Sequence, residues 1–236
     1  MKTMHIHATA AIAAALFAFG CTESIDSKNI KTAGIAALID ATSTNGTATT
    51  VLVELKTGGA QSNTYVDLSD GDALSVEVDG KTYEMSAEGN GYEAEIPTGA
   101  ADTEFKVSFQ RRNDTSAPDS KGQMPAPFTL DDIPTGDHSR AEDLVITWDA
   151  ASASASEMSI QLDGNCIFVE TFEVPDSGTY TVRGGELKAT SDDMPKSCVV
   201  EVELRRTRKG TADVGYDSES WFRLHQVRTT SFTSAP

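Results

Sequence analysis

Residues 74–85 read LSVEVDGKTYEM, in which two short runs of alternating apolar and polar residues flank the dipeptide Asp79-Gly80. Alternation with a period of two places the apolar side chains on one face of a β-strand. Asp-Gly tolerates the positive φ angles of a tight turn, so this stretch predicts a β-hairpin. It favours an antiparallel β fold over a helical one.

The same two-residue period recurs along most of the chain. Further alternating apolar sets are Ile35, Ala37 and Ile39; Val51, Val53 and Leu55; Tyr92, Ala94 and Ile96; Phe105, Val107 and Phe109; Leu144, Ile146 and Trp148; Met158, Ile160 and Leu162; Cys166 and Phe168; Tyr180 and Val182; Cys198, Val200, Val202 and Leu204; and Phe222 and Leu224. Short strands separated by turn residues about every 8–12 positions are typical of two-sheet antiparallel sandwiches. The sequence therefore predicts an all-β fold.

The alternation stops in a polar segment, residues 113–134, that contains four prolines. Because proline cannot donate a hydrogen bond to a sheet, this segment is expected to be an extended connector. Phe128 and Leu130 indicate that part of it packs on a domain. The chain is thus predicted to contain two antiparallel β-sandwich domains, over residues 32–134, which include the connector, and residues 135–236.

One strand pattern carries a resemblance to a known fold. Leu144-x-Ile146-x-Trp148 is similar to the early strand of fibronectin type III and immunoglobulin-like domains, where a Trp fills the space between the sheets. The resemblance covers one domain and implies an immunoglobulin-like fold and no activity. The other half of the chain has the same alternating pattern, so the same architecture is expected for both domains.

The N-terminal residues predict that the protein is exported from the cytoplasm. Residues 8–19 are almost wholly apolar and follow a weakly basic start. This stretch is shorter than the roughly 20 residues of a membrane-spanning helix, and it falls within the about 7–15 residues of a signal-peptide core. Residues 1–20 are therefore predicted to be a signal peptide.

The signal peptide is followed by a candidate lipidation site. Ala18-Phe19-Gly20-Cys21 resembles the lipobox of bacterial lipoproteins, which implies that Cys21 carries lipid such as palmitate and anchors the protein to a membrane. Residues 21–31 would then form a flexible tether of about 15–20 Å. Thr22 follows Cys21 where many Gram-negative lipoproteins retained in the inner membrane have Asp. The resemblance thus implies the outer membrane of a bacterial cell envelope.

The three cysteines favour lipidation over simple secretion. Ala18-x-Gly20 also fits an ordinary secretory cleavage site, which would leave Cys21 as a free thiol. In an oxidising compartment, however, Cys166 and Cys198 can pair, and lipid on Cys21 accounts for the odd cysteine. A redox or metal pair would need CxxC spacing or nearby histidines, and Cys166 and Cys198 have neither.

The charge balance excludes nucleic acid as the main partner. The chain has 19 Lys and Arg against 36 Asp and Glu, a net charge of -17, which repels phosphate backbones. Four cations nevertheless cluster as Arg205, Arg206, Arg208 and Lys209. They predict either a basic patch for lipid phosphates or an acidic partner, or a hairpin tip whose cations pair with neighbouring glutamates.

Acidic residues offer one candidate for an ion site. Asp67, Asp70 and Asp72 lie within six residues, and calcium prefers such carboxylate oxygens in loops. The loop lacks the EF-hand order and its terminal Glu, so a solvated turn is the alternative reading.

Motifs for catalysis are absent from the sequence. After the signal peptide the histidines are His138 and His225, and no G-x-S-x-G, H-E-x-x-H or P-loop pattern occurs. No catalytic residue, metal or cofactor is predicted. We therefore expect a non-catalytic envelope lipoprotein that binds a protein or a glycan. The alternatives are a structural spacer and a hydrolase. A hydrolase would require a concave cluster of acids or a histidine with a perturbed pKa in a cleft. His225 bonded to both a carboxylate and a serine in a pocket would favour it.

Overall fold

The computed structural model describes residues 23–131, 133, 136–151, 156–190 and 196–236, and this part of the chain is almost entirely β. Its helices are two single 3-10 turns, η1 (Ser27–Asn29) and η2 (Thr32–Gly34). The strands are β1 (Glu23–Asp26), β2 (Ile35–Ser43), β3 (Thr49–Thr57), β4 (Thr64–Asp67), β5 (Ala73–Val78), β6 (Lys81–Glu84), β7 (Ser86–Glu88), β8 (Gly91–Ile96), β9 (Glu104–Gln110), β10 (Ala117–Gln123), β11 (Asp137–Ser139), β12 (Leu144–Thr147), β13 (Glu157–Asp163), β14 (Glu170–Val174), β15 (Thr179–Val182), β16 (Cys198–Lys209) and β17 (Trp221–Ala235). The all-β prediction is confirmed.

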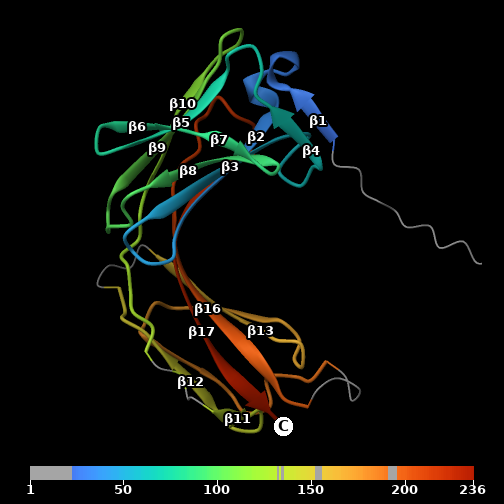
Figure 1. Cartoon of the computed structure of the whole chain (residues 1–236), viewed down its shortest axis with the longest axis vertical. Coiled ribbons are helices and arrows are strands. Elements are labelled where there is room, and N and C mark those ends of the chain that lie inside the picture. The colour runs from blue at the N-terminus through green and yellow to red at the C-terminus, as the bar shows by residue number, and fades with distance from the viewer. Residues whose placement is uncertain (1–22, 132, 134–135, 152–155, 191–195) are drawn as a thin grey trace, which may run out of the picture.

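One large sheet runs through the whole molecule. Its strand order is β1-β4-β3-β2-β17-β16-β13-β14, with β7, β8 and β11 attached at the sides. Separate sheets of four strands, β10-β9-β5-β6, and of two strands, β12-β15, cover one face of it. Figure 1 shows two lobes that are joined by β16 and β17.

Each lobe has its own hydrophobic core between two layers of strands. The first-lobe core includes Ile39, Val76 and Phe109 from the N-terminal half of the chain. The second-lobe core includes Ile146 and Val202. Burial of these alternating apolar faces is the main favourable contribution to folding.

Strand β17 contributes to both cores. Phe222 and Leu224 lie in the first-lobe core, whereas Phe232 lies in the second. This is possible because β17 pairs with β2 at its start and with β16 along most of its length. The division into domains at residues 134 and 135 therefore stays a prediction.

The hairpin predicted at residues 74–85 is present. Strands β5 and β6 are antiparallel, and Val78 lies opposite Lys81. Asp79 and Gly80 between them have φ angles of 50° and 73°. Two consecutive positive φ angles characterise the turn that matches the twist of paired strands.

Two local expectations were wrong. Residues 117–123, expected in the connector, form β10 at the edge of the four-stranded sheet, where Pro118 is tolerated because an edge strand has one unpaired side. Phe168 is 53% exposed, and its neighbour Ile167 is buried instead. Residues 166–169 lie outside the named strands, so the two-residue alternation does not apply there.

Residues 23–31 pack against the first lobe. Strand β1 pairs in parallel with β4, with Ile25 opposite Val66. The predicted flexible tether over residues 21–31 is thus corrected for residues 23–31, because backbone pairing holds them against the first lobe. The predicted signal peptide at 1–20 and the predicted lipid on Cys21 lie outside the described residues.

The predicted pairing of Cys166 with Cys198 is present in the structure. Their Cα atoms are 5.7 Å apart, and the bridge closes a separation of 32 residues at one end of the second-lobe core. Replacing both cysteines with serine is expected to lower the free energy of unfolding by about 2–4 kcal/mol, since the unfolded chain would gain conformational freedom. Urea unfolding of the oxidised and variant proteins measures the loss. Equal midpoints, or reactive thiols at these positions in the unreduced protein, would contradict the prediction.

Helices long and apolar enough to serve as membrane spans do not occur in the described part of the chain.

Candidate functional site

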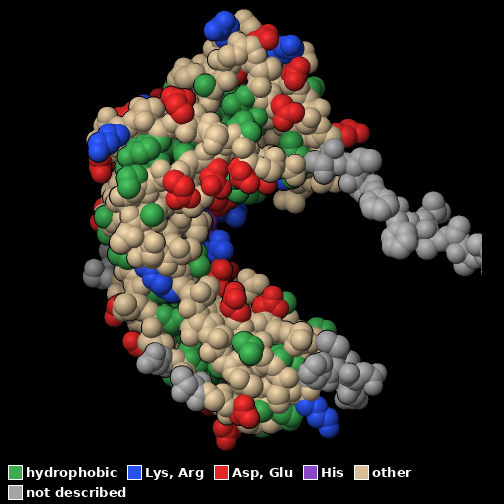
Figure 2. Space-filling view, in the orientation of Figure 1, with side chains coloured by type: hydrophobic (Ala, Val, Ile, Leu, Met, Phe, Trp, Pro, Cys, Tyr) green, Lys and Arg blue, Asp and Glu red, His purple; other side chains and the backbone are tan. Residues whose placement is uncertain are grey.

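A polar cavity of about 460 Å³, here called the waist cavity, lies on the uncovered face of the large sheet. Its charged residues are the acids Asp40, Glu157 and Glu173 and the cations Arg205, Lys209 and Arg223. Figure 2 shows Lys and Arg side chains inside the hollow between the lobes, with acidic side chains on both sides. The site therefore presents both signs of charge to a ligand.

Strand alternation explains why these side chains share one face. In β17, Phe222 and Leu224 point into the first-lobe core, so Arg223 and His225 point away from it. Strand pairing then aligns the neighbours: His225 lies opposite Thr207, and Arg223 lies between Lys209 and Asp40. Residues far apart in sequence thus form one polar row across the sheet.

A hydrogen-bonded chain of three side chains lies in the waist cavity. The imidazole Nδ1 of His225 is 2.9 Å from the hydroxyl of Thr207, and its Nε2 is 3.1 Å from Oδ1 of Asp40. His225 is only 4% exposed, so both ring nitrogens are held in place. A hydroxyl, an imidazole and a carboxylate in this order can orient a ligand or transfer a proton.

The charged neighbours of this chain are partly paired. Lys209 Nζ is 2.8 Å from Glu157, and Arg205 is 2.9 Å from Glu203. The guanidinium of Arg223 instead lies over the ring of Trp221, at 4.4 Å from its centroid. Within the described residues, Arg223 takes part in none of the ion pairs.

Asp40, Thr207 and Arg223 were not singled out from the sequence. Asp40 carried a usable signal, because it interrupts the otherwise apolar run of residues 35–41. Thr207 and Arg223 gave none, since polar residues at outward positions of strands are common.

The four clustered cations do not form one basic patch. Because successive side chains of β16 alternate between faces, Arg205 and Lys209 face the waist cavity, whereas Arg206 and Arg208 point to the other side. Arg208 reaches Asp102 at 2.7 Å. The pairing of Arg205 with Glu203 matches the alternative reading of these cations.

Arg206 is a buried structural residue at the junction of the lobes. Its side chain is 1% exposed and forms two bonds to Asp176, at 2.7 and 3.0 Å. It also donates to the carbonyl oxygens of Ala126 and Asp149, and it lies 4.7 Å from the ring centroid of Phe128. Arg206 thus ties the chain around residues 126–128 to the second lobe.

The acidic loop predicted as an ion site has other partners. Asp72 is nearly buried and lies 2.7 Å from Nε of Arg111, while Asp70 is 3.7 Å from Lys28. Asp67 ends β4. In the part of the chain that is described, three or more His, Cys, Asp or Glu side chains nowhere come together as a metal site.

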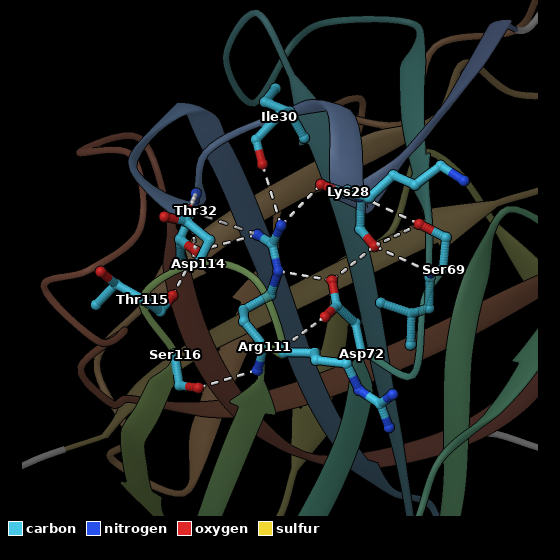
Figure 3. Close-up of polar contacts among 12 residues, drawn as sticks. Lys28, Ile30, Thr32, Ser69, Asp72, Arg111, Asp114, Thr115 and Ser116 are labelled. Carbon is cyan, nitrogen blue, oxygen red and sulfur yellow. Dashed lines mark hydrogen bonds and ion pairs between the residues drawn. The ribbon is translucent and has the colours of Figure 1, made fainter.

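Arg111 and Asp72 are the centre of a buried polar network, shown in Figure 3, that we call the N-terminal cluster. The two residues are neighbours because they flank the paired ends of β9 and β5. The guanidinium of Arg111 also donates to the carbonyl oxygens of Ser27 and Ile30, at 2.7 and 3.1 Å, and to the hydroxyl of Thr32 at 3.0 Å. The cluster therefore fastens η1 and η2 to the first lobe.

Asp114 adds a pH-sensitive contact to the N-terminal cluster. The backbone N–H of Thr32 donates to its carboxylate at 2.7 Å and, with the backbone at Thr115, lowers the pKa of Asp114. A carboxyl whose pKa is lowered on folding stabilises the fold above its unfolded pKa of about 3.9 and loses this contribution as the pH falls through the folded value. We expect the hydrogen-exchange protection of the Thr32 amide, corrected for intrinsic rates, to be constant from about pH 7 to about pH 5 and to fall below about pH 4. Asp114→Asn should remove this pH step; a step unchanged in the variant would contradict the assignment.

Comparisons with known proteins support a lipoprotein at the N-terminal side of the chain. Residues 9–110 match the family described as the Mycobacterium 19 kDa lipoprotein antigen. The match confirms the resemblance to bacterial lipoproteins that the Ala18–Cys21 sequence predicted, and it covers the range in which Cys21 lies. No curated protein sequence matches the chain significantly.

The similarity to one solved structure is weak. A crystal structure of red sea bream transglutaminase aligns with a TM-score of 0.25 and 11% identity, over 86% of this chain and 31% of that one. The chain thus spans less than a third of that protein's length. A superposition of this quality establishes neither a shared fold nor a shared activity.

Proposed function

We propose that the chain is a non-catalytic, lipid-anchored protein of the bacterial cell envelope that binds a partner in the waist cavity. The observation that carries the proposal is this cavity, in which three acids, three cations and His225 from five strands of one sheet line a single hollow. A few convergent polar groups in a concave site are typical of ligand recognition. A pure spacer would need no such site.

The proposal includes the lipid anchor and the membrane that carries it. Lipid on Cys21 would place the first lobe next to the membrane, because β1 begins at Glu23, two positions after Cys21. More than one acyl chain on Cys21 would give stable anchoring, where a single chain is marginal. We propose the outer membrane as the site, and a protein or a glycan as the partner.

The architecture is part of the same proposal. Each lobe packs two layers of strands around one core, as immunoglobulin-like sandwiches do. We propose that the two lobes are sandwiches of this kind that share β16 and β17. Sharing two long strands would limit bending between the lobes and keep the cavity in one shape.

Site-specific photo-crosslinking tests the proposed function. A photoreactive residue replaces Ser159 in the waist cavity of the full lipidated chain, and in a matched control it replaces Thr181, which is exposed on β15. We expect an adduct in whole cells from position 159 and none from position 181, with its mass distinguishing protein from glycan. Equal adducts from both positions, or none from position 159, would contradict binding in the cavity.

A second candidate function is supported by the chain of Thr207, His225 and Asp40. In an acyl-transfer hydrolase, the Thr207 hydroxyl would attack an ester or amide carbonyl and His225 would accept its proton, while Asp40 would hold the ring. His225 would then pass the proton to the departing alcohol or amine, and water would release the acyl group from Thr207. Lys209 and Arg205, two residues to either side of Thr207, line the same cavity and would supply positive charge to a developing oxyanion.

Hydrolysis of an activated phenyl ester separates the two candidates. Under the binding proposal, Thr207→Val and His225→Gln leave the background rate of the protein unchanged. Under the hydrolase reading, either substitution lowers the rate by about 100-fold or more, as expected for loss of a nucleophile or a general base. Ser159→Ala serves as the control from the same cavity and should have no effect in either case.

A further inference from the structure

A pair of like charges lies at one edge of the waist cavity. Lys209 on β16 is directly opposite Arg223 on β17. Like charges at opposite positions of paired strands destabilise the sheet. Glu157 compensates Lys209 at 2.8 Å. Arg223 also lies opposite Asp40 on β2, but the Asp40 carboxylate bonds to His225, and Arg223 belongs to none of the ion pairs of the described residues. The two adjacent cations, one of which takes part in no ion pair of the described residues, leave positive charge at this edge that a bound anion would neutralise.

Arg223 is held in position to meet such an anion. Its guanidinium lies 4.4 Å from the centroid of the Trp221 ring. Trp221 packs in turn against a small buried cluster of Ala36, Leu38 and Ala60, so the ring is fixed to the sheet. An arginine stacked on an aromatic ring keeps its planar set of N–H donors available for a two-pronged bond to a carboxylate or phosphate.

Lys209 and Arg223 also line two neighbouring cavities. A second cavity of about 560 Å³ is formed by the loop between β16 and β17, and it shares Lys209 and Arg223 with the waist cavity. The side chain of Val214 in this loop is fully exposed. A ligand whose anionic group bonds to Arg223 could therefore extend into either cavity.

We propose that Arg223, assisted by Lys209, is an anion site that binds a carboxylate or phosphate group of the ligand. This inference deepens the proposed function, on which it rests, by assigning the chemical class of the recognised group. Carboxylate and phosphate share the chemistry of paired oxygen acceptors, and separate probes distinguish them.

Tryptophan fluorescence of the lipidated chain provides the first readout, with tetraglutamate peptide and sodium phosphate as separate probes at constant ionic strength. The chain has two tryptophans, and Trp148 is buried in the second-lobe core, so a change reports mainly on Trp221. Isothermal titration calorimetry measures the same affinities independently of the ring. We expect saturable binding of at least one probe, and the tighter one identifies the source of the anion.

Substitutions then locate the site. Arg223→Gln is expected to weaken binding about 10-fold or more, as a charge-assisted hydrogen bond of about 1.5–3 kcal/mol requires. Arg223→Lys should bind more tightly than Arg223→Gln, because lysine keeps the positive charge. It should bind more weakly than the wild type, because it lacks the planar set of N–H donors of the guanidinium. Arg183→Gln, at an exposed arginine just after β15, is the matched control and should bind like the wild type. No saturable binding of either probe, or equal affinities of the Arg223→Gln and Arg183→Gln variants, would overturn the inference.

The outcome is independent of the crosslinking test. A partner crosslinked at position 159 without anion binding would support the proposed function and overturn the anion site. Anion binding that Arg223→Gln removes, without any crosslink from position 159, would support the anion site and count against the proposed partner.

Discussion

Replacing Arg206 with methionine is expected to lower the free energy of unfolding by about 3–5 kcal/mol, because the Asp176 carboxylate would stay nearly buried without its cation. Asp176 would keep its bond from the Trp148 indole at 2.8 Å, and this neutral donor does not replace a charge. The carbonyl oxygens of Ala126 and Asp149 would also lose their donor. Unsatisfied buried acceptors add to the cost.

Arg208→Met is the matched control, since it removes the same type of side chain from the same face of β16. Arg208 pairs with Asp102, which is 71% exposed, and pairs open to water contribute about 0–1 kcal/mol. Urea unfolding of both variants measures the difference. Equal losses would show that Arg206 and Asp176 are not a buried pair. The double variant Arg206→Met/Asp176→Leu should recover much of the loss, because two apolar groups in place of a buried ion pair are tolerated.

Arg111→Met is expected to have an effect of similar size, about 3–5 kcal/mol, centred on the N-terminal cluster. Asp72 would remain buried with donors from Ser27 and the backbone of Arg112 and without a cation. The carbonyl oxygens of Ser27 and Ile30 would lose the guanidinium that holds η1. We therefore expect residues 27–34 to detach from the first lobe before the rest of the fold is lost.

Hydrogen exchange resolved by peptide measures this local effect. The Arg111→Met variant should exchange faster in residues 27–34 than in β13 and β16, whereas Arg112→Met, at an exposed neighbour, should match the wild type. Uniformly faster exchange over both lobes would instead mean that the cluster stabilises the whole fold and does not specifically hold the N-terminal segment. Because this segment leads to Cys21, its attachment would decide how closely the first lobe follows the proposed lipid anchor.

The strands themselves could be predicted from sequence because alternation is a local property. The runs at 74–78, 105–109 and 200–204 form strands with the expected apolar face buried. Prediction was wrong where the local pattern was interrupted or misleading. Pro118 argued against a strand at the position of the edge strand β10. Phe168 was expected on a buried face, but it is exposed and Ile167 is buried instead.

Only some residues of the candidate site could be predicted from the sequence. His225 was noted as the histidine to examine, yet its partner Asp40 lies 185 residues earlier in the chain. The four cations of β16 were considered as one patch because they are close together in the sequence. Side chains that are neighbours in a strand point to opposite faces, so closeness in sequence does not place them together. The faces then assign Arg206 to the lobe junction and Lys209 to the cavity.

The sequence by itself determined the β character of the chain, the tight turn at Asp79-Gly80 and the two cysteines free to pair, since these depend on near neighbours and on counting. Only the tertiary structure decided that β17 lies between β2 and β16, that β17 contributes to both cores, and that Asp40, Thr207, His225 and Arg223 meet. The physical reason is that strand order and register depend on contacts between residues far apart in the chain, which a local pattern of side chains does not encode.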